Sequence, residues 1–520
     1  MNKEIPSGDF LSSPRRGVFF FLALIIPICW MSLIRILAMP DGESANDAYY
    51  HAAMAEQGPS VFLAKKFPSL ELSVWRDTFA DKELLYHFLL YGLFRVQKLF
   101  IPAVQAPFHF PAICVLCLLT AALLFAMKRM GVSPPLYLPM VMLSLMSASN
   151  VMFRVLMLRP HVLSLILMFL LCGMLSGGSL RSRLLWSGVI SVFYAWSYSN
   201  PQFILIPVLF FAVAGIRDSG WKNLWLIGAS AGGVLLGLLL HPQFPNSFMI
   251  WKVQSLTALV GPLLSPGTFR YATLLPPQEM MAPGVLWNCR ALPMYGFAYV
   301  NFLIFSRLAV HRGWKNIPSH YYAVGGLSLL FTIGTFLVLR TIEYAGPFAG
   351  LFGSLVWSMA LKERIFLPGT GKPVRFCLVL TLLVFLMASW SSVLNIGFAR
   401  SVTYPATGIG GWLDRNLPPK TLVVNLSWGD FPPLYQAARK PVFLWGMDPE
   451  FSYAADPKRS RRIELFLLNR GEMTPRRFRT ATGAKYAVLL ARREKFVEFL
   501  KQLGWRTLYE AEDGAVLVAD

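Results

Sequence analysis

The sequence predicts a polytopic α-helical membrane protein of about 11 transmembrane helices with a small extracytoplasmic α/β domain at its C-terminal end. Of the 520 residues, 55% are hydrophobic and only 14% are charged, whereas an average soluble domain is roughly a quarter charged. A soluble core would not hide so much apolar surface, so lipid is expected to surround most of the chain. Long apolar runs with short connections, and a change to alternating strand and helix patterns near residue 403, complete the prediction.

The first apolar run, Val18–Ala38, follows Arg15 and Arg16. It is long enough to cross a bilayer, which takes about 20 residues. The apolar core of a cleaved signal peptide would be shorter, at about 7–15 residues. We therefore predict a retained signal anchor with the N-terminus inside the cell.

Ten further apolar runs are expected to span the membrane, at 108–127, 134–153, 161–177, 184–199, 202–216, 224–240, 294–306, 321–339, 345–361 and 376–395. Basic residues cluster between alternate pairs of runs, at 128–129, 181–183, 217–222, 307–315 and 362–375. Loops rich in Lys and Arg stay in the cytoplasm. With the N-terminus inside, this number of spans places every basic cluster in the cytoplasm.

Residues 84–100 (LLYHFLLYGLFRVQKLF) are apolar enough to form a short span. Counting them as a span would invert the topology of everything downstream, and Arg95, Gln97 and Lys98 would then lie in an unfavourable place. We therefore predict an interfacial or re-entrant helix that lies on the membrane.

The net charge of +21 is explained by the cytoplasmic loops and by contact with anionic membrane lipids. The sequence contains no helix-turn-helix, zinc-finger or RNA-recognition pattern, which argues against a nucleic-acid partner. The six cysteines lie mostly inside apolar runs and lack the spacing of metal ligands.

The predicted topology places most of the unusual polar residues on one side of the membrane. The outer face receives 39–107, 154–161, 199–202, 241–293, 340–346 and the tail after residue 399. This convergence predicts a single extracytoplasmic site. The chain is accordingly divided into a transmembrane module, 1–400, with outer loops at 39–107 and 241–293, and a soluble α/β domain, 401–520.

Alternating apolar and polar residues predict strands in the tail. They lie at Thr421–Ser427, Pro441–Trp445, Lys485–Leu490 and Ala515–Ala519, and a helical pattern covers Glu494–Leu503. Aromatic and acidic residues that follow the first two strands suit carbohydrate stacking, although turn formation explains them equally well: Trp428, Asp430, Trp445, Asp448 and Glu450.

The first outer loop carries Asp47 and His51 in the stretch Asp-Ala-Tyr-Tyr-His. If this stretch is helical, His51 lies one turn after Asp47 on the same face. A carboxylate close to the bilayer surface can meet the reactive end of a lipid whose tail stays in the membrane. The alternative is that Asn46 and Asp47 only cap the helix.

A second acidic stretch in the same loop contains Asp77, Asp81, Glu83 and His87. Together with Asp47 these carboxylates could hold a divalent cation through oxygen atoms, or polarise an acceptor hydroxyl. The alternative is a solvated acidic loop whose charges pair with Arg76 and Lys82.

These two motifs resemble the GT-C-fold integral-membrane glycosyltransferases, which include oligosaccharyltransferases, protein O-mannosyltransferases and aminoarabinose transferases. Asp47–His51 resembles the D-x-Y-Y-H element of their first outer loop, and Asp81–His87 is loosely similar to the acidic and HPPLY region that follows. The HPPL and WWDYG sequences of the superfamily are missing. The resemblance is closest to bacterial members and leaves the substrate open.

The resemblance implies an inverting transfer of a sugar from a polyprenyl-phosphate-type donor to an extracytoplasmic glycan, lipid or protein acceptor, in the inner (plasma) membrane of a bacterium. Asp47 is the expected base, with His51 and Asp81 as further catalytic residues and Asp47 and Asp81 as ligands of a Mg or Mn ion. A leaving phosphate needs positive charge, preferably a guanidinium. The expected substrate-binding residues are Asp77, Glu83, His87, Arg159, His161, Arg340 and Glu343.

Alternatives stay open both for the phosphate-binding residues and for the protein class. Arg159 and Arg340 could equally reach lipid head groups from the ends of their spans. A lipid-linked glycan polymerase, ligase or flippase-like protein would have a similar organisation. A transporter is a weaker alternative, because transporters place ionisable residues near the middle of the membrane.

Overall fold

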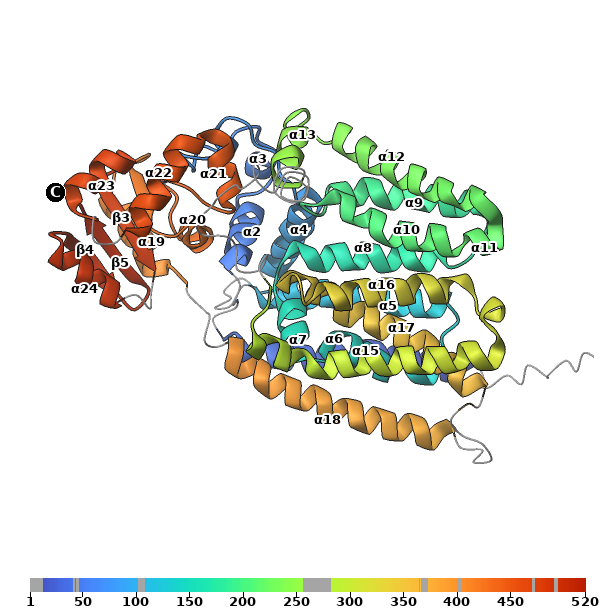
Figure 1. Cartoon of the computed structure of the whole chain (residues 1–520). Helices are drawn as coiled ribbons and strands as arrows, with labels where there is room; N and C mark the ends of the chain where they lie inside the picture. Colours follow the sequence, from blue (N-terminus) through green and yellow to red (C-terminus); the bar gives the residue numbers. More distant parts are fainter. Residues whose placement is uncertain are drawn as a thin grey trace, which may run out of the picture.

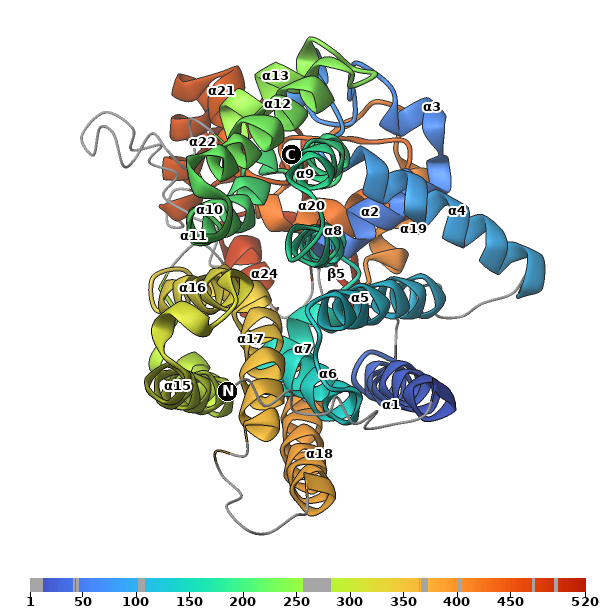
Figure 2. The same cartoon turned by 90° about the vertical axis from the view of Figure 1, so that its right-hand side faces the viewer.

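The computed structural model describes residues 13–40, 43, 46–101, 108–255, 282–363, 365, 373–399, 405–469, 473–490 and 494–520. A large bundle of roughly parallel helices occupies one part of the molecule, and a five-stranded sheet with its own helices lies beyond one end of the bundle (Figure 1). The view along the bundle axis shows many of these helices end-on (Figure 2).

The bundle is built from the apolar runs of the sequence, each of which forms a helix or a bent pair of helices. Its principal helices are α1 (Ser13–Ala38), α5 (His109–Arg129), α6 (Tyr137–Met146), α7 (Ser149–Leu156), α8 (Pro160–Leu175), α9 (Leu180–Ala195), α10 (Leu205–Ala214), α12 (Trp225–Leu239), α15 (Val285–Arg312), α16 (Ser319–Gly334), α17 (Ile342–Lys362) and α18 (Pro373–Ala399). Short helical turns join them: η2 (Pro134–Leu136), η3 (Pro201–Ile204), α11 (Ile216–Ser219), η4 (Gly220–Leu224), η7 (Trp314–Asn316) and η8 (Leu339–Thr341).

Within the described residues, five helices are long and apolar enough to cross a membrane, or six if one bent pair counts as a single span. Helices α8 and α10 are apolar but shorter. The number of spans expected from the sequence, about 11, therefore stays a prediction.

The bent pair is α6 and α7, which meet at 88° where the sequence predicts one continuous run, 134–153. The break falls at Ala148, whose backbone is extended. A second extended residue, Arg159, precedes Pro160 at the start of α8. A proline disfavours helical backbone in the residue before it and fits the first turn of a helix. The chain therefore turns between α7 and α8 and presents Arg159 at the end of the bundle.

Close backbone contact holds α17 in the centre of the bundle, where most of its residues are buried. A Cβ atom added to Gly350 would lie 2.6 Å from the Cα atom of Ser144 in α6. Only glycine lets the two helices approach this closely. This close packing buries most of α17, including Glu343 in its first turn.

Helix α4 (Leu84–Phe100) lies across the end of the bundle, whereas α5 and α8 run along the bundle axis (Figures 1 and 2). One face of α4 packs inward through Tyr86, His87 and Leu90, while Leu99 and Phe100 are exposed. This orientation agrees with the interfacial helix that the sequence predicts, although its position at the membrane surface stays a prediction.

The rest of the first outer loop forms α2 (Asn46–Gln57), α3 (Pro59–Phe62) and η1 (Val74–Arg76). The second predicted outer loop, 241–293, begins with α13 (Asn246–Trp251) and ends within α15. Its residues 256–281, which include Tyr271, lie outside the described residues.

The tail forms a mixed sheet in the order β2-β1-β3-β5-β4. Strand β1 (Leu422–Asn425) pairs in parallel with β2 (Val442–Phe443) and β3 (Tyr486–Leu490), while β5 (Gly514–Val518) pairs antiparallel with β3 and β4 (Arg506–Ala511). The helices of the tail are α19 (Thr407–Asn416), η9 (Trp428–Asp430), α20 (Phe431–Ala437), α21 (Pro449–Ala455), α22 (Pro457–Leu468), α23 (Pro475–Thr482) and α24 (Glu494–Gln502).

Four strands overlap the predicted ones, but β4 was not predicted. It is an edge strand whose residues are exposed or half-buried, so it lacks the apolar pattern by which a strand is recognised. The boundary predicted at residue 400 falls at residues 400–404, which lie outside the described residues. The division into two domains stays a prediction.

The first outer loop extends the sheet at its β2 edge. Leu70 forms a parallel bridge with Phe443, and the backbone N–H groups of Glu71 and Leu72 donate to the carbonyls of Phe443 and Leu444 at 2.8 and 2.7 Å. Apolar side chains of both regions then form one buried cluster, which includes Tyr50, Phe67, Trp75, Phe431, Tyr435 and Phe451. The sheet is therefore fixed to the loop that carries Asp47.

The predicted topology can be tested by cysteine labelling. In a variant whose native cysteines are replaced by alanine, a membrane-impermeant maleimide applied to right-side-out vesicles should label a cysteine at Thr480 but not one at Arg181, because both positions are exposed in the fold and are predicted on opposite sides. Both should react in detergent. The reverse pattern in vesicles would show that residues 84–100 span the membrane.

Candidate active site

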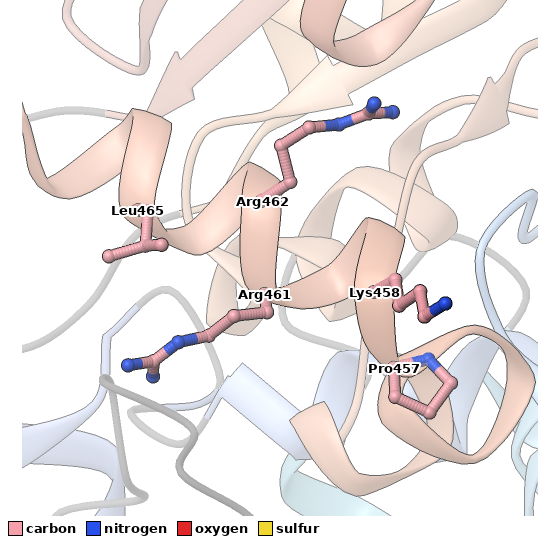
Figure 3. Close-up of a pocket in the computed structure, with 5 residues that line it drawn as sticks. All are labelled: Pro457, Lys458, Arg461, Arg462 and Leu465. Carbon is pink, nitrogen blue, oxygen red and sulfur yellow. The ribbon is translucent and has the colours of Figure 1, made fainter.

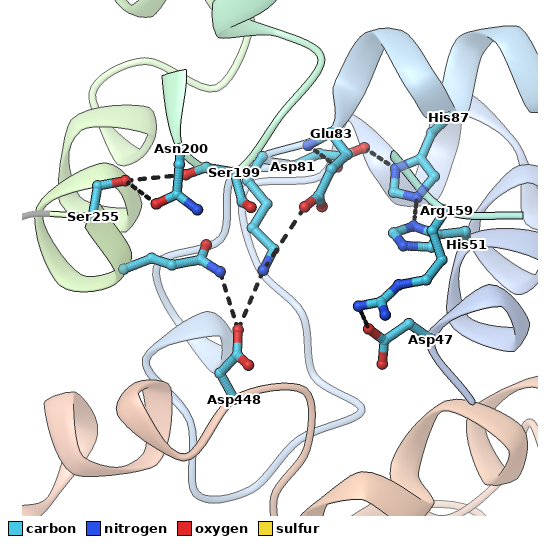
Figure 4. Close-up of polar contacts among 12 residues, drawn as sticks. Asp47, His51, Asp81, Glu83, His87, Arg159, Ser199, Asn200, Ser255 and Asp448 are labelled. Atoms are coloured by element: carbon cyan, nitrogen blue, oxygen red, sulfur yellow. Dashed lines mark hydrogen bonds and ion pairs between the residues drawn. The ribbon is translucent and has the colours of Figure 1, made fainter. Parts of the chain in front are cut away.

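Asp47 lies in the first turn of α2, where the positive end of a helix dipole favours an acidic residue. Its carboxylate pairs with the Arg159 guanidinium at the start of α8, with 2.5 Å between Oδ2 and Nη2 (Figure 4). The Asp47 side chain is 35% exposed and that of Arg159 is 8% exposed. The structure thus joins two separately predicted residues, and the carboxylate is the more accessible partner.

Contacts of Asn46 and Glu43 position this ion pair. Asn46 donates from its side-chain amide to the carbonyl of Gly429 in η9, at 3.1 Å. The buried Glu43 carboxylate accepts from the backbone N–H of Leu158 at 3.0 Å and from Arg35 of α1 at 3.0 Å. Glu43 therefore fixes the turn that carries Arg159, a role that the sequence analysis missed. The position of Glu43 shortly after the first apolar run was the sequence signal that could have indicated this role.

His51 lies one turn after Asp47 on α2 and begins a chain of hydrogen bonds. Its Nδ1 is 2.8 Å from Nε2 of His87 on α4, and Nδ1 of His87 is 2.5 Å from Oδ2 of Asp81. All three residues are buried. The sequence predicts each residue but not the contacts, which join the two motifs of the first outer loop (Figure 4).

Asp81 is held in place by its own loop and by the second outer loop. Its Oδ1 accepts the backbone N–H of Glu83 at 3.1 Å. Its backbone N–H donates to Oε1 of Gln243 at 2.7 Å, and His241 donates to its carbonyl at 3.1 Å. Gln243 was not predicted, although it stands among polar residues directly after an apolar run.

Lys82 joins the first outer loop to the tail. Its Nζ lies 3.9 Å from Glu83 and 3.5 Å from Asp448, and Gln254 donates to the same Asp448 oxygen at 3.0 Å. Burial raises the pKa of Glu83 to about 7, although the positive charge of Lys82 opposes this effect. Glu83 is thus a buried carboxyl that titrates near neutral pH.

Burial lowers the pKa of His51 well below its ordinary value, and the positive charges of His87, Arg159 and Lys82 lower it further. His51 is therefore a neutral imidazole at neutral pH. A neutral imidazole can accept a proton on one ring nitrogen.

Arg154 and Arg340 share the buried carboxylate of Glu343. Arg154 contacts Oε1, and Arg340 lies 3.6 Å from Oε2 and above the ring of Tyr198. His161 is buried and donates from Nε2 to the carbonyl of Arg154 at 2.9 Å. His161 therefore stabilises the turn between α7 and α8, and its role in substrate binding stays a prediction.

Asp77 lies at the end of η1 with an exposed side chain. Within the described residues it forms no hydrogen bond or ion pair with the other predicted site residues. Its neighbour Arg76 pairs with Glu71 at 2.7 Å. The structure thus leaves Asp77 outside the cluster of Asp47, His51, Asp81 and His87.

A small cavity of about 20 Å³ lies between the Asp81–Lys82 segment and Tyr198. Its lining also includes Ser199, His241 and Trp251. This volume is enough for about one water molecule.

The tail contributes to the site through η9 and Asp448 rather than through all of its predicted aromatic residues. Trp445 is fully buried and donates to the carbonyl of Asn425 at 2.9 Å, so it is not a stacking surface for a sugar. Trp428 is half-buried in η9, beside the contact to Asn46. An open hollow of about 520 Å³ on α22, lined by Pro457, Lys458, Arg461, Arg462 and Leu465, contains none of the predicted site residues (Figure 3).

The described residues do not fit the predicted cation site. They contain no group of three or more His, Cys, Asp or Glu side chains placed to hold a metal ion. Both carboxylate oxygens of Asp81 accept hydrogen bonds from the protein, and Asp47 pairs with Arg159. A divalent cation prefers oxygen ligands that are free to face it.

No protein-family model and no curated protein matches the chain. Solved structures do. The apo oligosaccharyltransferase of Archaeoglobus fulgidus is similar with a TM-score of 0.62 over 92% of this chain and 70% of that chain, at 12% identity. A structure of the archaeal oligosaccharyltransferase AglB from the same organism, in complex with an inhibitory peptide and a dolichol-phosphate, has a TM-score of 0.54 over 91% of this chain and 69% of that chain, at 13% identity.

ArnT from Cupriavidus metallidurans is similar over nearly the full length of both chains, with a TM-score of 0.55 over 98% of this chain and 99% of that chain, at 12% identity. These proteins are GT-C-fold glycosyltransferases, and the present chain has the GT-C fold. The fold implied by Asp47–His51 is confirmed, while identities this low leave the activity to be argued from the site.

Because the described residues contain no fitting set of metal ligands, we can predict how the purified protein responds to divalent cations. A ligand that binds only the folded state raises the unfolding temperature. We expect millimolar Mg or Mn, and EDTA, to leave the unfolding temperature unchanged. A rise with Mn that is lost in Asp47→Asn, but kept in the matched control Asp218→Asn, would show that the cation predicted from the sequence does bind.

Proposed function

We propose that the protein is a membrane glycosyltransferase that moves a sugar from a polyprenyl-phosphate-type donor to an extracytoplasmic acceptor. The observation that carries this proposal is the Asp47–Arg159 pair, in which an accessible carboxylate meets a guanidinium at the end of a GT-C-fold bundle. Of the similar structures, one contains a dolichol-phosphate and another an acceptor peptide. Both support a lipid-linked donor and an acceptor bound from outside.

In the proposed reaction an acceptor hydroxyl attacks the anomeric carbon of the sugar. A new glycosidic bond forms as the bond to the phosphate oxygen breaks, and the polyprenyl phosphate leaves as an anion. A single displacement of this kind inverts the anomeric configuration. Asp47 accepts the proton of the hydroxyl, which makes the oxygen a better nucleophile.

The leaving phosphate needs positive charge, and three guanidinium groups lie around the turn between α7 and α8. Arg159 contacts Asp47 directly, while Arg154 and Arg340 share Glu343. Planar guanidinium groups bind phosphate through two parallel hydrogen bonds. Because Arg340 is the more accessible partner of Glu343, with 26% of its side chain exposed, we assign it to the phosphate.

The apolar tail of the donor requires a lipid-facing surface beside the site. Large apolar side chains are exposed along several bundle helices, including Phe21 of α1, Leu303 of α15 and Leu382 of α18. Their exposure supports insertion in a bilayer. Following the resemblance of the sequence, we place the protein in the bacterial inner membrane with the sheet on the periplasmic side.

The proposal is tested by Asp47→Asn, which keeps the size of the side chain but removes its ability to accept a proton. We expect a loss of at least about 100-fold in transfer, the usual contribution of a general base. The measurement is the release of polyprenyl phosphate from a panel of polyprenyl-phosphate sugars, with cell-envelope glycan as the acceptor.

Asp218→Asn is the matched control, because Asp218 lies in α11, is not among the candidate site residues and pairs with its neighbour Arg217. This variant should transfer at the wild-type rate. Equal rates for Asp47→Asn and the wild type would show that Asp47 is not the base.

A further inference from the structure

Helices α22 and α23 of the tail carry a high concentration of positive charge. Their sequences contain seven basic residues and one acidic residue, Glu464. Glu464 is buried and accepts a hydrogen bond from the Tyr453 hydroxyl at 2.6 Å. Helix α24 of the same tail, by contrast, carries two basic and two acidic residues. The charge is therefore concentrated on one part of the tail.

The two helices lie side by side. The rings of Phe466 in α22 and Phe478 in α23 are 6.4 Å apart, and Arg459 donates to the carbonyl of Thr482 at 3.3 Å. Arg459 also pairs with Glu71 of the first outer loop at 3.8 Å, so its charge serves the fold. The other basic residues of the two helices form what we call the basic surface, in which Arg461 is half-buried and the rest are exposed: Lys458, Arg461, Arg462, Arg476, Arg477 and Arg479.

The stability of the two helices does not explain these charges. A helix dipole favours acidic residues in the first turn and opposes basic ones, yet Lys458 lies in the first turn of α22, and Arg476 and Arg477 lie in that of α23. Lys458 and Arg462 are also one turn apart, where like charges destabilise a helix. The expected topology does not explain them either, because the tail is predicted outside, whereas the positive-inside rule concerns short cytoplasmic loops.

The open hollow of about 520 Å³ belongs to the basic surface. Pro457 and Leu465 supply its apolar lining, and Lys458, Arg461 and Arg462 supply its positive charge (Figure 3). Leu465 is 49% exposed. The volume lies within the usual range for ligand sites, about 300–1,000 Å³. The hollow therefore offers a ligand both an exposed apolar side chain and three cations.

We propose that the basic surface binds a polyanionic glycan of the cell envelope, that is, a polysaccharide whose repeating unit carries a negative charge. The C–H face of a sugar ring can pack on Leu465 and Pro457, which removes apolar surface from water. The anionic groups can pair with guanidinium groups, which bind oxyanions through two parallel hydrogen bonds. A repeating charge also matches cations that are distributed over two helices.

The position of the basic surface favours a glycan over an anionic bilayer. Figure 1 shows α22 and α23 farther from the helix bundle than α2 and α4. The apolar bundle is the part of the chain expected in the bilayer, and α4 is the helix expected at its surface. The basic surface therefore lies beyond the expected membrane surface, where a cell-envelope glycan can reach it.

The basic surface is connected to the loop that carries Asp47. Glu71, the partner of Arg459, donates from its backbone N–H to the carbonyl of Phe443 in β2 at 2.8 Å. A glycan held on α22 would thus be bound to the same assembly of sheet and loop as Asp47. Binding of the glycan goes beyond the proposed function, whereas its use as the acceptor of the transfer rests on that function.

The experiment measures binding to the full-length protein in a non-ionic detergent by microscale thermophoresis. Polygalacturonate is the anionic probe, and dextran is the neutral control. The test variant replaces Lys458, Arg462 and Arg476 by Gln. A matched control variant loses the same number of charges at exposed basic residues elsewhere in the tail, by replacing with Gln the residues Arg415, Lys420 and Lys495. Unfolding temperatures show that each variant folds.

We expect the test variant to bind polygalacturonate about 10-fold more weakly than the wild type, because each exposed ion pair changes an equilibrium by a factor of about 1.5 to 5. The control variant should bind like the wild type, dextran should not bind, and added salt should weaken the wild-type complex. Equal weakening in both variants would show that only the net charge matters and would overturn the proposal.

Leu465→Ser distinguishes a glycan from other polyanions. We expect this variant to bind polygalacturonate about threefold more weakly but to bind inorganic polyphosphate, which has no apolar face, like the wild type. If neither affinity changes, the surface recognises charge alone and the assignment to a glycan is wrong. If soluble dihexanoyl phosphatidylglycerol displaces polygalacturonate at an equal concentration of charge, the surface binds lipid head groups instead.

Binding is measured without a sugar donor, so the two proposals can fail separately. If the test variant binds polygalacturonate like the wild type, the basic surface is not a glycan site, while the role proposed for Asp47 stands. If Asp47→Asn transfers sugar at the wild-type rate, the base assignment is wrong, while the glycan bound on α22 and α23 stands.

Discussion

The ion pair between Asp47 and Arg159 connects the two halves of the site. Asp47 belongs to the loop that packs on the sheet, and Arg159 belongs to the bundle. A neighbouring contact positions each partner. Asn46, next to Asp47, hydrogen bonds to η9, and Glu43 accepts a hydrogen bond from Leu158, next to Arg159. Without this pair, a carboxylate at the open end of the bundle would have no cation beside it.

The electrostatics of the site follow from the exclusion of water. Three buried acids have a basic or N–H partner: Glu43 has Arg35, Glu343 has Arg154, and Asp81 has His87 and the backbone of Glu83. Such pairs are required because an isolated charge is too costly in a low-dielectric interior. Asp47 differs, since more than a third of its side chain reaches solvent. This difference is the reason why we propose Asp47 as the residue that meets a substrate.

The sequence predicted the helical runs, four of the five strands and the residues Asp47, His51, Asp81 and His87, because these depend on local periodicity and residue chemistry. It missed the bend between α6 and α7, since the apolar run continues through Ala148 without a break. It also missed the partners that come from distant segments, such as Gln243 for Asp81 and Asp448 for Lys82. No local pattern encodes such pairings, which arise only when the bundle is closed.

The backbone pairing of residues 69–72 with β2 has a mechanical consequence. Three main-chain hydrogen bonds join Ser69, Glu71 and Leu72 to Phe443 and Leu444, next to a shared aromatic cluster. Because the loop that carries α2 is fixed to the sheet, a ligand that tilts the sheet would also move α2 and change the distance from Asp47 to Arg159. A movement of the sheet and a movement of the Asp47 carboxylate are in this way coupled.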